Sequence, residues 1–526
     1  MTSQRLTLFD DGREREVATA LAELTYCNPF QRRRVELERA ALGERFVDYD
    51  VVWHERGEAG RNNPNLDALE SMAEELAGTL RERLHRRGKV AAEEARAYRD
   101  LVFYLLFNRH EDDLLALVVT AAEGRARGAF PAWPDFRREL EHYLEPLPNP
   151  LAKEMDPAHL CACFFQVRRA FHHIFRFILG SSAPAARLRA EVWHSIFGHD
   201  LRRYYRTLHA CIGDITTLVT GPSGTGKEVV ARAIALSRYL PFEPSSASFA
   251  GALEGLFVPL NLSALSPTLV ESELFGHRRG AFTGAIENRT GWLESCPATG
   301  TVFLDEIGEV SPAIQVKLLR VLENRSFERL GESRPRRFEG KLVAATNRDL
   351  DRAMRAGRFR EDLYYRLCGD LIRTPSLAER LASDPGELHH LVLFLARRIV
   401  GPDEAERLAA EVEAWVDARL GPGYPWPGNI RELDQCVRNV LLRQKYRPPA
   451  ASPGLDPGKR LAAEVAAGSL TLEELSACYA VLIHSRTASY SATGCRLGVD
   501  RRTVKRWVEG STEDREGDGA ASDYPP

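Results

Sequence analysis

A phosphate-binding loop is indicated by one run of residues, Gly221-Pro222-Ser223-Gly224-Thr225-Gly226-Lys227-Glu228. The apolar run Ile215 to Val219 precedes it, and residues 228–234 follow it with helical character. Strand, glycine loop and helix form the context of a P-loop, in which backbone N–H groups and the helix N-terminus surround a polyphosphate and the lysine reaches its β and γ oxygens. Glu228 stands where Ser or Thr usually ligates Mg²⁺, and a glycine-rich loop formed by chance is the alternative.

Two carboxylates end a second apolar segment, Gly300 to Glu306. This segment predicts a buried strand, and its position after a P-loop suits Mg²⁺ held by Asp305, with Glu306 orienting or deprotonating the attacking water. An ordinary strand with an acidic end is the other explanation. A further strand, 342–347, ends at Asn347, a polar group suited to sensing the γ-phosphate.

Two arginines, Arg360 and Arg366, follow at a short spacing in the segment 359–366. Arginine stabilises the charge that develops in phosphoryl transfer, also when a neighbouring subunit supplies it. Taken singly, each arginine fits a surface salt bridge at least as well. Their role therefore depends on the rest of the pattern.

The segment Gly280-Ala281-Phe282-Thr283-Gly284-Ala285 places one aromatic side chain among small residues, which indicates a mobile loop with a single apolar tip. Here the chain resembles the sigma-54-dependent transcription activators, the bacterial enhancer-binding proteins of the AAA+ ATPases. The hexapeptide matches the signature loop of that family without substitution. The resemblance covers roughly residues 180 to 445 and the C-terminal helix pair described below.

The resemblance implies an α/β AAA+ P-loop core with a helical lid, a homo-oligomeric ring, usually a hexamer, and ATP-driven remodelling of the sigma-54 RNA polymerase holoenzyme. ATP and Mg²⁺ are the implied cofactors. Glu occupies the last P-loop position in this family, so Glu228 fits the pattern. By motif alignment, Asn261 holds Glu306 in a switch, Phe327 to Gly331 form a second pore loop, and Arg431 in the lid motif senses the nucleotide.

The site residues that follow from the motifs and the resemblance fall into three groups. The catalytic group is Asp305, Glu306, Asn261, Asn347, Arg360 and Arg366, with the two arginines acting in trans. The nucleotide-binding group is Gly221, Pro222, Ser223, Gly224, Thr225, Gly226, Lys227, Glu228 and Arg431, with Asp305 as the Mg²⁺ ligand. The sigma-54 contact is Gly280, Ala281, Phe282, Thr283, Gly284 and Ala285.

Three departures from the family pattern concern packing and subunit contacts. The stretch from Ser237 to Leu256 is longer than the family usually has between the P-loop helix and the next strand. Leu262-Ser263 replaces a small pair after Asn261, and Cys368-Gly369-Asp370 replaces Asn-Val-Phe. None of these changes removes a residue with a catalytic role.

The C-terminal region has the pattern of a helix-turn-helix. A Pro/Gly-rich linker from Arg447 leads to a helix through Leu472 and Leu482, and two short helices then flank a Leu-Gly-Val turn. The second helix starts near Asp500 and is basic, which suits phosphates and base edges in a major groove, and it resembles the Fis-like module of the family. A solvated basic face is the alternative. The candidate DNA-binding residues are Arg501, Arg502, Thr503, Lys505 and Arg506.

Residues 1–180 are predicted to be mainly helical and have no motif that identifies them. Apolar residues at helical spacing run from Leu66 to Leu84, and a second helix has Asp156 as its cap and Pro157 in its first turn. Strands do not alternate with helices, which argues against a receiver domain. From position alone we expect a regulatory role. A cluster of metal-ligand types occurs here, but the helical spacing favours packing over ligation. Its members are His159, Cys161, Cys163, His172 and His173.

The length and the composition of the chain agree with a multidomain protein. The chain has 526 residues, is 44% hydrophobic and 28% charged, and carries a formal charge of −3 from 71 basic and 74 acidic residues, so contact with nucleic acid requires a local basic patch. Nine scattered cysteines do not form a disulfide framework, and no secretion signal or membrane span is evident, which predicts a cytoplasmic protein with no membrane partner. The expected division is 1–180 helical regulatory domain, 181–370 AAA+ core, 371–446 lid, 447–468 linker, 469–510 helix-turn-helix and 511–526 disordered acidic tail.

The function expected from this pattern is an ATP-hydrolysing transcription regulator that binds upstream, enhancer-like DNA and promotes open complex formation by sigma-54 polymerase. Two alternatives stay open. One is a DNA-bound scaffold or repressor with a structural nucleotide site, and the other is a AAA+ remodeller of a different protein. ATP hydrolysis that depends on Glu306 would distinguish the expected function from the scaffold or repressor. Polymerase activation that depends on Phe282 would distinguish it from the remodeller of a different protein.

Overall fold

The computed structural model describes residues 7–49, 63–87, 90–122, 128–148, 156–251, 256–421, 423–448 and 471–516, with Gly458, Leu461 and Val465. The chain forms two compact units, Met1–Gln444 and Lys445–Pro526, and each is described by itself. Among the helices of these residues, none is both long and apolar enough to cross a lipid bilayer.

A five-stranded parallel sheet is the centre of the first unit. Its order is β11 (Asp370–Arg373), β1 (Thr217–Thr220), β10 (Lys341–Thr346), β7 (Thr301–Asp305) and β4 (Phe257–Asn261). All three strands expected from the motifs are present, and the carboxyl ends of β1, β7 and β10 meet at one edge. This sheet with helices on both faces confirms the predicted α/β P-loop core.

Alternate residues of each strand enter different hydrophobic cores, because successive side chains of a strand point to opposite faces. Leu218 packs with α13 (Pro267–Phe275), α15 (Pro312–Asn324) and α17 (Glu361–Leu367) on one face. Val219 packs on the other face with α12 (Lys227–Ala235). The strands therefore carry near-continuous apolar runs, as strands covered on both sides do.

The N-terminal third is helical, as predicted. The helix expected from Leu66 runs Leu66–Arg87, and the second expected helix runs Pro157–Phe177, with the Asp156 side chain accepting from the backbone N–H of His159 at 3.1 Å. The helices are α1 (Gly12–Leu24), α2 (Arg32–Leu42), α3 (Leu66–Arg87), α4 (Ala92–Arg109), α5 (Glu111–Ala122), α6 (Trp133–Leu144), α8 (Pro157–Phe177) and α9 (Ala183–Phe197).

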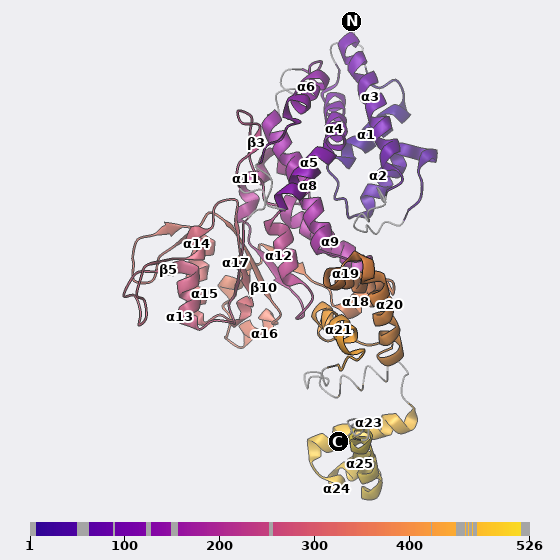
Figure 1. Ribbon diagram of the computed structural model, residues 1–526, viewed down its shortest axis with the longest axis vertical. Helices are drawn as coiled ribbons and strands as arrows, with labels where there is room; N and C mark the ends of the chain where they lie inside the picture. The colour runs from indigo at the N-terminus through magenta and orange to yellow at the C-terminus, as the bar shows by residue number, and fades with distance from the viewer. Residues whose placement is uncertain are drawn as a thin grey trace. The chain divides into compact units, whose positions relative to one another are not determined.

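The hydrophobic core continues from these helices into the ATPase sheet without a break at residue 180. One cluster contains Leu21 of α1, Phe164 of α8, Val192 of α9 and Val219 of β1. In Figure 1, α8 and α9 lie between the indigo N-terminal helices and the strands of the sheet. The face of the sheet that carries α12 is therefore covered in part by the N-terminal third.

The long stretch after α12 forms a hairpin of β2 (Phe242–Glu243) and β3 (Ser248–Phe249). It packs against the N-terminal helices: the Phe249 ring stacks on Phe165 of α8 with centroids 4.0 Å apart, and Trp133 of α6 lies 4.6 Å from Phe242. The backbone N–H of Phe249 also donates to the carbonyl of Gly128 at 2.9 Å. The additional residues between α12 and β4 thus form a hairpin on which the N-terminal third docks. Residues 252–255 lie outside the described residues.

The lid consists of α18 (Leu377–Ser383), α19 (Glu387–Val400), α20 (Pro402–Arg419) and α21 (Asn429–Arg443). It is fastened to the start of α9 by Glu387, which is fully buried, accepts from the backbone N–H of Ser182 at 2.9 Å and pairs with Arg380. The remaining short elements are η1 (Gly43–Arg45), α10 (Leu201–Arg203), the π-helix η2 (Tyr204–Leu208), α11 (His209–Cys211), η3 (Ile212–Asp214), β5 (Gly276–His277), β6 (Arg289–Thr290), α14 (Trp292–Ser295), η4 (Ile307–Glu309), β8 (Ser326–Phe327), β9 (Arg336–Arg337) and α16 (Leu350–Arg355).

The second unit contains α23 (Leu472–Thr487), α24 (Tyr490–Leu497) and α25 (Arg501–Glu516), which pack on one another. Asp500 caps α25 by accepting from the backbone N–H groups of Arg502 and Thr503 at 2.7 and 3.0 Å. The helices flank the expected turn. However, α25 continues to Glu516, six residues past the point where we expected order to end. Residues 517–526 and most of the expected linker lie outside the described residues.

Candidate nucleotide site and partner loop

The loop after β1 has the backbone shape of a phosphate cradle. Gly221, Gly224 and Gly226 have φ angles of 147°, 77° and 92°, a region that favours glycine. A Cβ at Gly221 would collide with Thr374, and one at Gly224 with the carbonyl of Gly428. Glycine is therefore required at these positions both by conformation and by the close approach of neighbouring backbone.

Lys227 is the first residue of α12 and is buried within the loop that precedes it. Its Nζ donates to the carbonyls of Gly221 and Pro222 at 3.0 and 3.1 Å. Burial lowers the pKa of Lys227 below its usual value, and the nearby carboxylates of Glu306 and Asp305 oppose that shift. The ammonium group thus faces both the loop and the predicted metal-binding strand end.

The two predicted carboxylates lie at the carboxyl end of β7. Burial raises the pKa of Asp305, while the backbone N–H of Glu306 and the charge of Lys227 act to lower it. The backbone of Glu306 has φ 56° and ψ 48°, a left-handed conformation that is uncommon for residues other than glycine. Its Oε2 accepts from the backbone N–H of Asn347 at 3.2 Å, at the end of β10.

Asn261 ends β4 and lies beside Asp305 in the strand register. Its Oδ1 accepts from the backbone N–H and the hydroxyl of Ser263 at 2.9 and 2.8 Å. Within this described part of the chain, no hydrogen bond joins Asn261 to Glu306. Because its oxygen is engaged by Ser263, the amide group of Asn261 keeps its N–H donors for a carboxylate, which is the chemistry that the predicted switch requires.

The lid contacts the P-loop directly. Arg431 donates to the hydroxyl of Ser223 at 3.2 Å, and the backbone N–H of Ile430 donates to the carbonyl of Gly224 at 3.0 Å. Asn429 has φ 53° and is buried; its Nδ2 donates to the carbonyl of Ser223 at 2.9 Å. The predicted sensor arginine is thus brought to the loop that it is expected to monitor.

Two supporting residues were missed by sequence reasoning, which assigned a role to neither Asn429 nor Thr374. Thr374 is fully buried; its Oγ1 lies 2.7 Å from that of Thr225, and it donates to the carbonyl of Thr220 at 3.2 Å. Asn429 stands within the lid motif directly after Gly428, and this position was a usable signal. Thr374 follows β11 and had no local signal.

The two predicted trans arginines lie on the surface at α17. Arg360 donates from Nε and Nη2 to the Asp362 carboxylate at 3.0 and 2.6 Å, which raises the pKa of the guanidinium. Arg366 lies 3.8 Å from Glu323. Among the described residues, no hydrogen bond connects either arginine to the P-loop of its own chain. The structure therefore leaves both side chains outside the site that the other residues form.

The predicted partner loop is an exposed loop above a two-strand stem, β5 and β6. The N–H of Gly280 donates to the carbonyl of Ala285 at 2.8 Å and closes the loop. Thr283 is exposed, whereas Phe282 is half-buried with its ring 5.0 Å from that of His277. Ile286, just beyond the hexapeptide, is 78% exposed and was not singled out from the sequence.

The second predicted loop is joined to the stem of the first. The backbone N–H of Arg278 donates to the carbonyl of Leu330 at 3.0 Å, and the N–H of Leu330 donates to the carbonyl of Gly276 at 3.0 Å. A Cβ at Gly331 would lie 2.9 Å from the Cβ of Ala281, closer than side chains pack. The two loops therefore form one connected feature.

Three other features expected from the sequence are Glu228, the segment 368–370 and the cluster of His and Cys residues. Glu228 is exposed and pairs with Arg232 on the next turn of α12 at 3.0 Å. The segment Cys368-Gly369-Asp370 departs from the family pattern. Its Asp370 accepts a hydrogen bond from the hydroxyl of Thr217 at 3.0 Å and anchors β11 beside β1. The third is the cluster of His159, Cys161, Cys163, His172 and His173. In the part of the chain that the structure describes, no group of three or more such side chains is placed to hold a metal, and Cys161, Cys163 and His173 are buried.

The residues fit a nucleoside triphosphate with Mg²⁺. The loop offers backbone N–H groups at the start of α12, a buried lysine and an arginine from the lid, which suit the charge of a triphosphate. Asp305 is a half-buried carboxylate within the electrostatic reach of Lys227, which suits a hard cation bound beside phosphate oxygens. This fold and site define a P-loop ATPase core of the AAA+ type with a helical lid.

Comparison with known proteins finds similarity to the central part of the chain. Residues 199–372 match the family model described as the Sigma-54 interaction domain. The Nif-specific regulatory protein of Azotobacter vinelandii is 47% identical over 43% of this chain and 40% of its own, and the DNA-binding transcriptional regulator NtrC of Azospirillum brasilense is 38% identical over 50% of this chain and 52% of its own. The central part of this chain is therefore similar to sigma-54 interaction domains, in agreement with the resemblance to the sigma-54-dependent activators.

The similarity is confined to part of each protein. This chain spans about two fifths to a half of the length of these curated relatives. Among solved structures, NtrX from Brucella abortus is 24% identical with a TM-score of 0.38, covering 66% of this chain and 72% of that chain.

Proposed function

We propose that this protein hydrolyses ATP in a ring of identical subunits and uses that energy to press the loop Gly280 to Ala285 against sigma-54, which remodels the polymerase holoenzyme toward the open complex. In this mechanism Lys227 and Arg431 bind the triphosphate, and Asp305 holds Mg²⁺, which supplies charge neutralisation on the phosphates. Glu306 orients and deprotonates the attacking water.

One observation carries this proposal: the partner loop is inserted between the two strands that carry the catalytic groups. The chain leaves β4 at Asn261, passes through α13 and β5 to the loop, and returns through β6 and α14 to β7, which ends at Asp305. Asn261 and Asp305 are register partners in the sheet. A change at the γ-phosphate that moves either strand end therefore acts on the base of the loop.

The test is open complex formation by purified protein with sigma-54 holoenzyme and a sigma-54 promoter. Promoter melting, followed by permanganate footprinting, is expected with ATP and not with a non-hydrolysable analogue. Equal melting with both nucleotides would refute the proposal. Melting that needs ATP but persists in Phe282→Ala would favour a AAA+ protein that acts on another partner, and an absence of turnover at any protein concentration would favour the scaffold.

The ring is proposed because, among the described residues, neither Arg360 nor Arg366 contacts the P-loop of its own subunit. Arg360 and Arg366 lie on the surface, paired with carboxylates of their own subunit, and phosphoryl transfer of this type uses an arginine that a neighbour can supply. A second subunit that brings α17 to the P-loop would complete the site. Ring formation and hydrolysis are therefore expected to rise together with protein concentration.

Binding to upstream DNA is proposed for the second unit. Arg501, Arg502, Lys505 and Arg506 are exposed in the first two turns of α25, whereas Thr503 is half-buried with its hydroxyl on Asp500 at 2.7 Å. Thr503 is thus as much a capping residue as a DNA contact. Replacing Arg501 and Arg502 by alanine should weaken duplex binding and lower the slope of log K against log salt by about 0.9 per lost phosphate contact. An unchanged slope would count against this surface.

The expected division stays a proposal: a regulatory region over 1–180, a core over 181–370, a lid over 371–446, a linker over 447–468, a helix-turn-helix over 469–510 and a tail over 511–526. Two of these borders are crossed by single elements, because β11 of the core sheet runs to Arg373 and α25 runs to Glu516. The docking of the N-terminal helices on α12 supports a regulatory role for the first region, because α12 carries the P-loop at its N-terminus. A cytoplasmic location follows from the proposed partners.

A further inference from the structure

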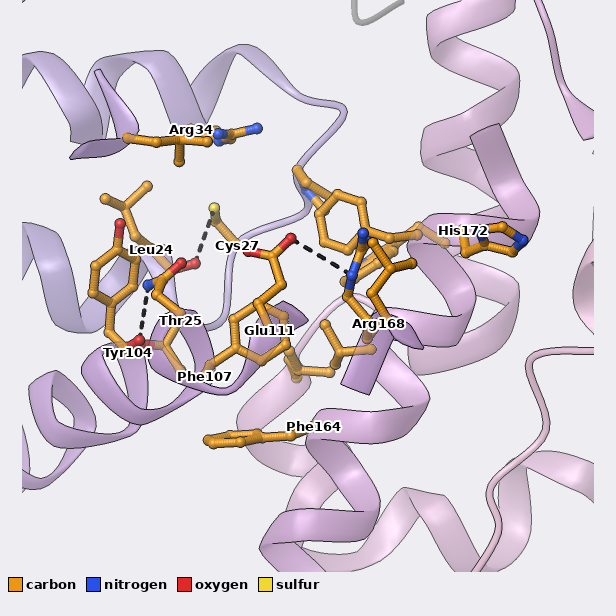
Figure 2. A pocket seen from close by; sticks show the side chains of 18 of the residues that line it. Leu24, Thr25, Cys27, Arg34, Tyr104, Phe107, Glu111, Phe164, Arg168 and His172 are labelled. Atoms are coloured by element: carbon orange, nitrogen blue, oxygen red, sulfur yellow. Dashed lines mark hydrogen bonds and ion pairs between the residues drawn. The ribbon is translucent and has the colours of Figure 1, made fainter. Parts of the chain in front are cut away.

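A cavity of about 340 Å³ lies inside the N-terminal helical region, between the end of α1, α2, α4, α5, α8 and α9. This volume is in the range of small-molecule sites in proteins. Aromatic side chains form much of its wall, among them Phe107 of α4 and Phe164 of α8, and Figure 2 shows both beside the cavity. The mechanism proposed above uses none of these residues.

The charges in the wall cancel one another. Arg34 pairs with Glu38 at 2.7 Å, and Arg168 lies 3.5 Å from Glu111, a contact that is drawn in Figure 2. Glu38 also accepts from Tyr49 and Asn63 at 2.8 and 3.0 Å.

The other titratable groups of the wall are neutral near pH 7. Burial raises the pKa of Cys27 to about 12, and burial together with Arg176 and Arg168 lowers the pKa of His172 to about 4. A charged ligand would therefore bring an uncompensated charge into a half-buried wall, which is costly.

Helix α8 separates this cavity from the ATPase. Phe164 and Arg168 line the cavity, whereas Gln166 donates from Nε2 to the carbonyl of Ser237 at 2.9 Å, and Arg169 donates to the carbonyl of Arg238 at 2.9 Å. Ser237 and Arg238 lie two and three residues beyond the end of α12, the P-loop helix. Phe165, next to Phe164, stacks on the hairpin after α12. A ligand that shifts α8 thus acts on the end of α12.

We propose that this cavity binds an uncharged, mainly apolar small molecule and that its occupancy changes nucleotide binding through α8. The binding step stands independently of the proposed function, and only the second step rests on it. The wall explains the ligand class: apolar rings provide contact area, and the two neutralised ion pairs accept or donate hydrogen bonds to one or two polar atoms of the ligand.

The experiment uses the full chain and two matched pairs of probes: indole with indole-2-carboxylate, and benzyl alcohol with benzoate. Isothermal titration and the shift in Tm are measured for wild type, for Leu115→Trp, which fills the cavity, and for Ala116→Trp, its exposed neighbour on α5 outside the cavity. The neutral probes should bind wild type and Ala116→Trp, and Leu115→Trp should weaken them at least about tenfold. The carboxylates should not bind.

Three outcomes would overturn the site: no binding of either neutral probe, equal binding of the carboxylates, or unchanged affinity in a folded Leu115→Trp. If that variant does not fold, Val167→Phe replaces it, since Val167 lines the same cavity from α8. The second step is measured as the affinity for a fluorescent ATP analogue with and without indole. An unchanged affinity would overturn the coupling while the site stands, and loss of ATP hydrolysis alone would bear only on the proposed function.

Discussion

Glu306 Oε2 accepts a 3.2 Å hydrogen bond from the backbone N–H of Asn347, which links the ends of two neighbouring strands of the sheet. This contact holds the carboxylate at the edge where Asp305 and the P-loop meet. A change at the nucleotide that moves the end of β10 therefore also moves the group proposed as the general base.

Glu306→Gln should abolish ATP hydrolysis and keep ATP binding. Glutamine retains the size and an oxygen for the Asn347 N–H but cannot take a proton from water, and general-base catalysis contributes about 10²- to 10⁴-fold. Phosphate release and binding of a fluorescent ATP analogue are the two measurements. Glu309→Gln, an exposed neighbour that pairs with Arg348, is the control and should hydrolyse normally. Hydrolysis within threefold of wild type in Glu306→Gln would show that another group is the base.

Arg360→Ala and Lys227→Ala should each be inactive alone and recover hydrolysis when mixed. In a mixed ring, the intact P-loop of one variant meets the intact arginine of the other, which is possible only if Arg360 acts across the subunit interface. The steady-state ATPase rate of the mixture is measured against each variant alone. A mixture of Arg360→Ala with Arg366→Ala is the control, because no subunit in it carries both arginines. Recovery in that control, or none in the first mixture, would contradict the trans assignment.

Phe282→Ala should leave ATP hydrolysis within about threefold of wild type and remove open complex formation. Phe282 lies in an exposed loop with its ring on that of His277, whereas Lys227 begins α12 and Asp305 ends β7. Leu269→Ala is the matched control, since Leu269 is 46% exposed on α13 outside the loop. Loss of hydrolysis in Phe282→Ala would mean that the loop belongs to the active site itself.

Much of the nucleotide site was predictable because its residues stand in short motifs whose spacing reflects local backbone geometry. The P-loop, the end of β7 and the lid motif each placed their residues before any fold was known. Thr374, Ser263 and the docking of Phe249 were not predictable, because each acts through partners far along the chain or through a hydrogen bond that spacing does not reveal. The helices of the N-terminal third were predictable from their period, but their shared core with the sheet was not.

The same limit applies to buried charge, as Lys341 shows. The sequence shows Lys341 as a polar residue at the start of a strand, yet its side chain is buried and donates from Nζ to the carbonyl of Ile215 at 2.7 Å. Burial, with the nearby Arg238, lowers the pKa of Lys341 from 10.5 to about 7. Between these two pH values the unfolded chain binds a proton that the folded protein lacks, so the free energy of unfolding should rise with pH across that window.

Lys341→Met should remove this contribution, which amounts to roughly 4 kcal/mol over the window. The Tm of wild type minus that of the variant, measured by calorimetry between about pH 7 and about pH 9.5, is expected to increase with pH. The subtraction cancels the titration of the other groups. Lys317→Met, which removes a partly exposed lysine paired with Glu271, is the control for replacing a lysine outside the buried site. A flat difference for Lys341→Met would show that the buried lysine stays protonated in the folded protein.

Phe249→Ala should separate the N-terminal helices from the ATPase core. Phe249 is 4% exposed, stacks on Phe165 and also packs against Phe130 and Phe242, and deleting such a ring typically costs about 3–5 kcal/mol. Because one hydrophobic core joins both regions, wild-type residues 1–444 should unfold in a single calorimetric transition, and the variant should show an earlier transition for the N-terminal helices. Ser245→Ala, at the exposed turn of the same hairpin, should behave as wild type. Two separate transitions in wild type would mean that the shared core does not couple the unfolding of the two regions.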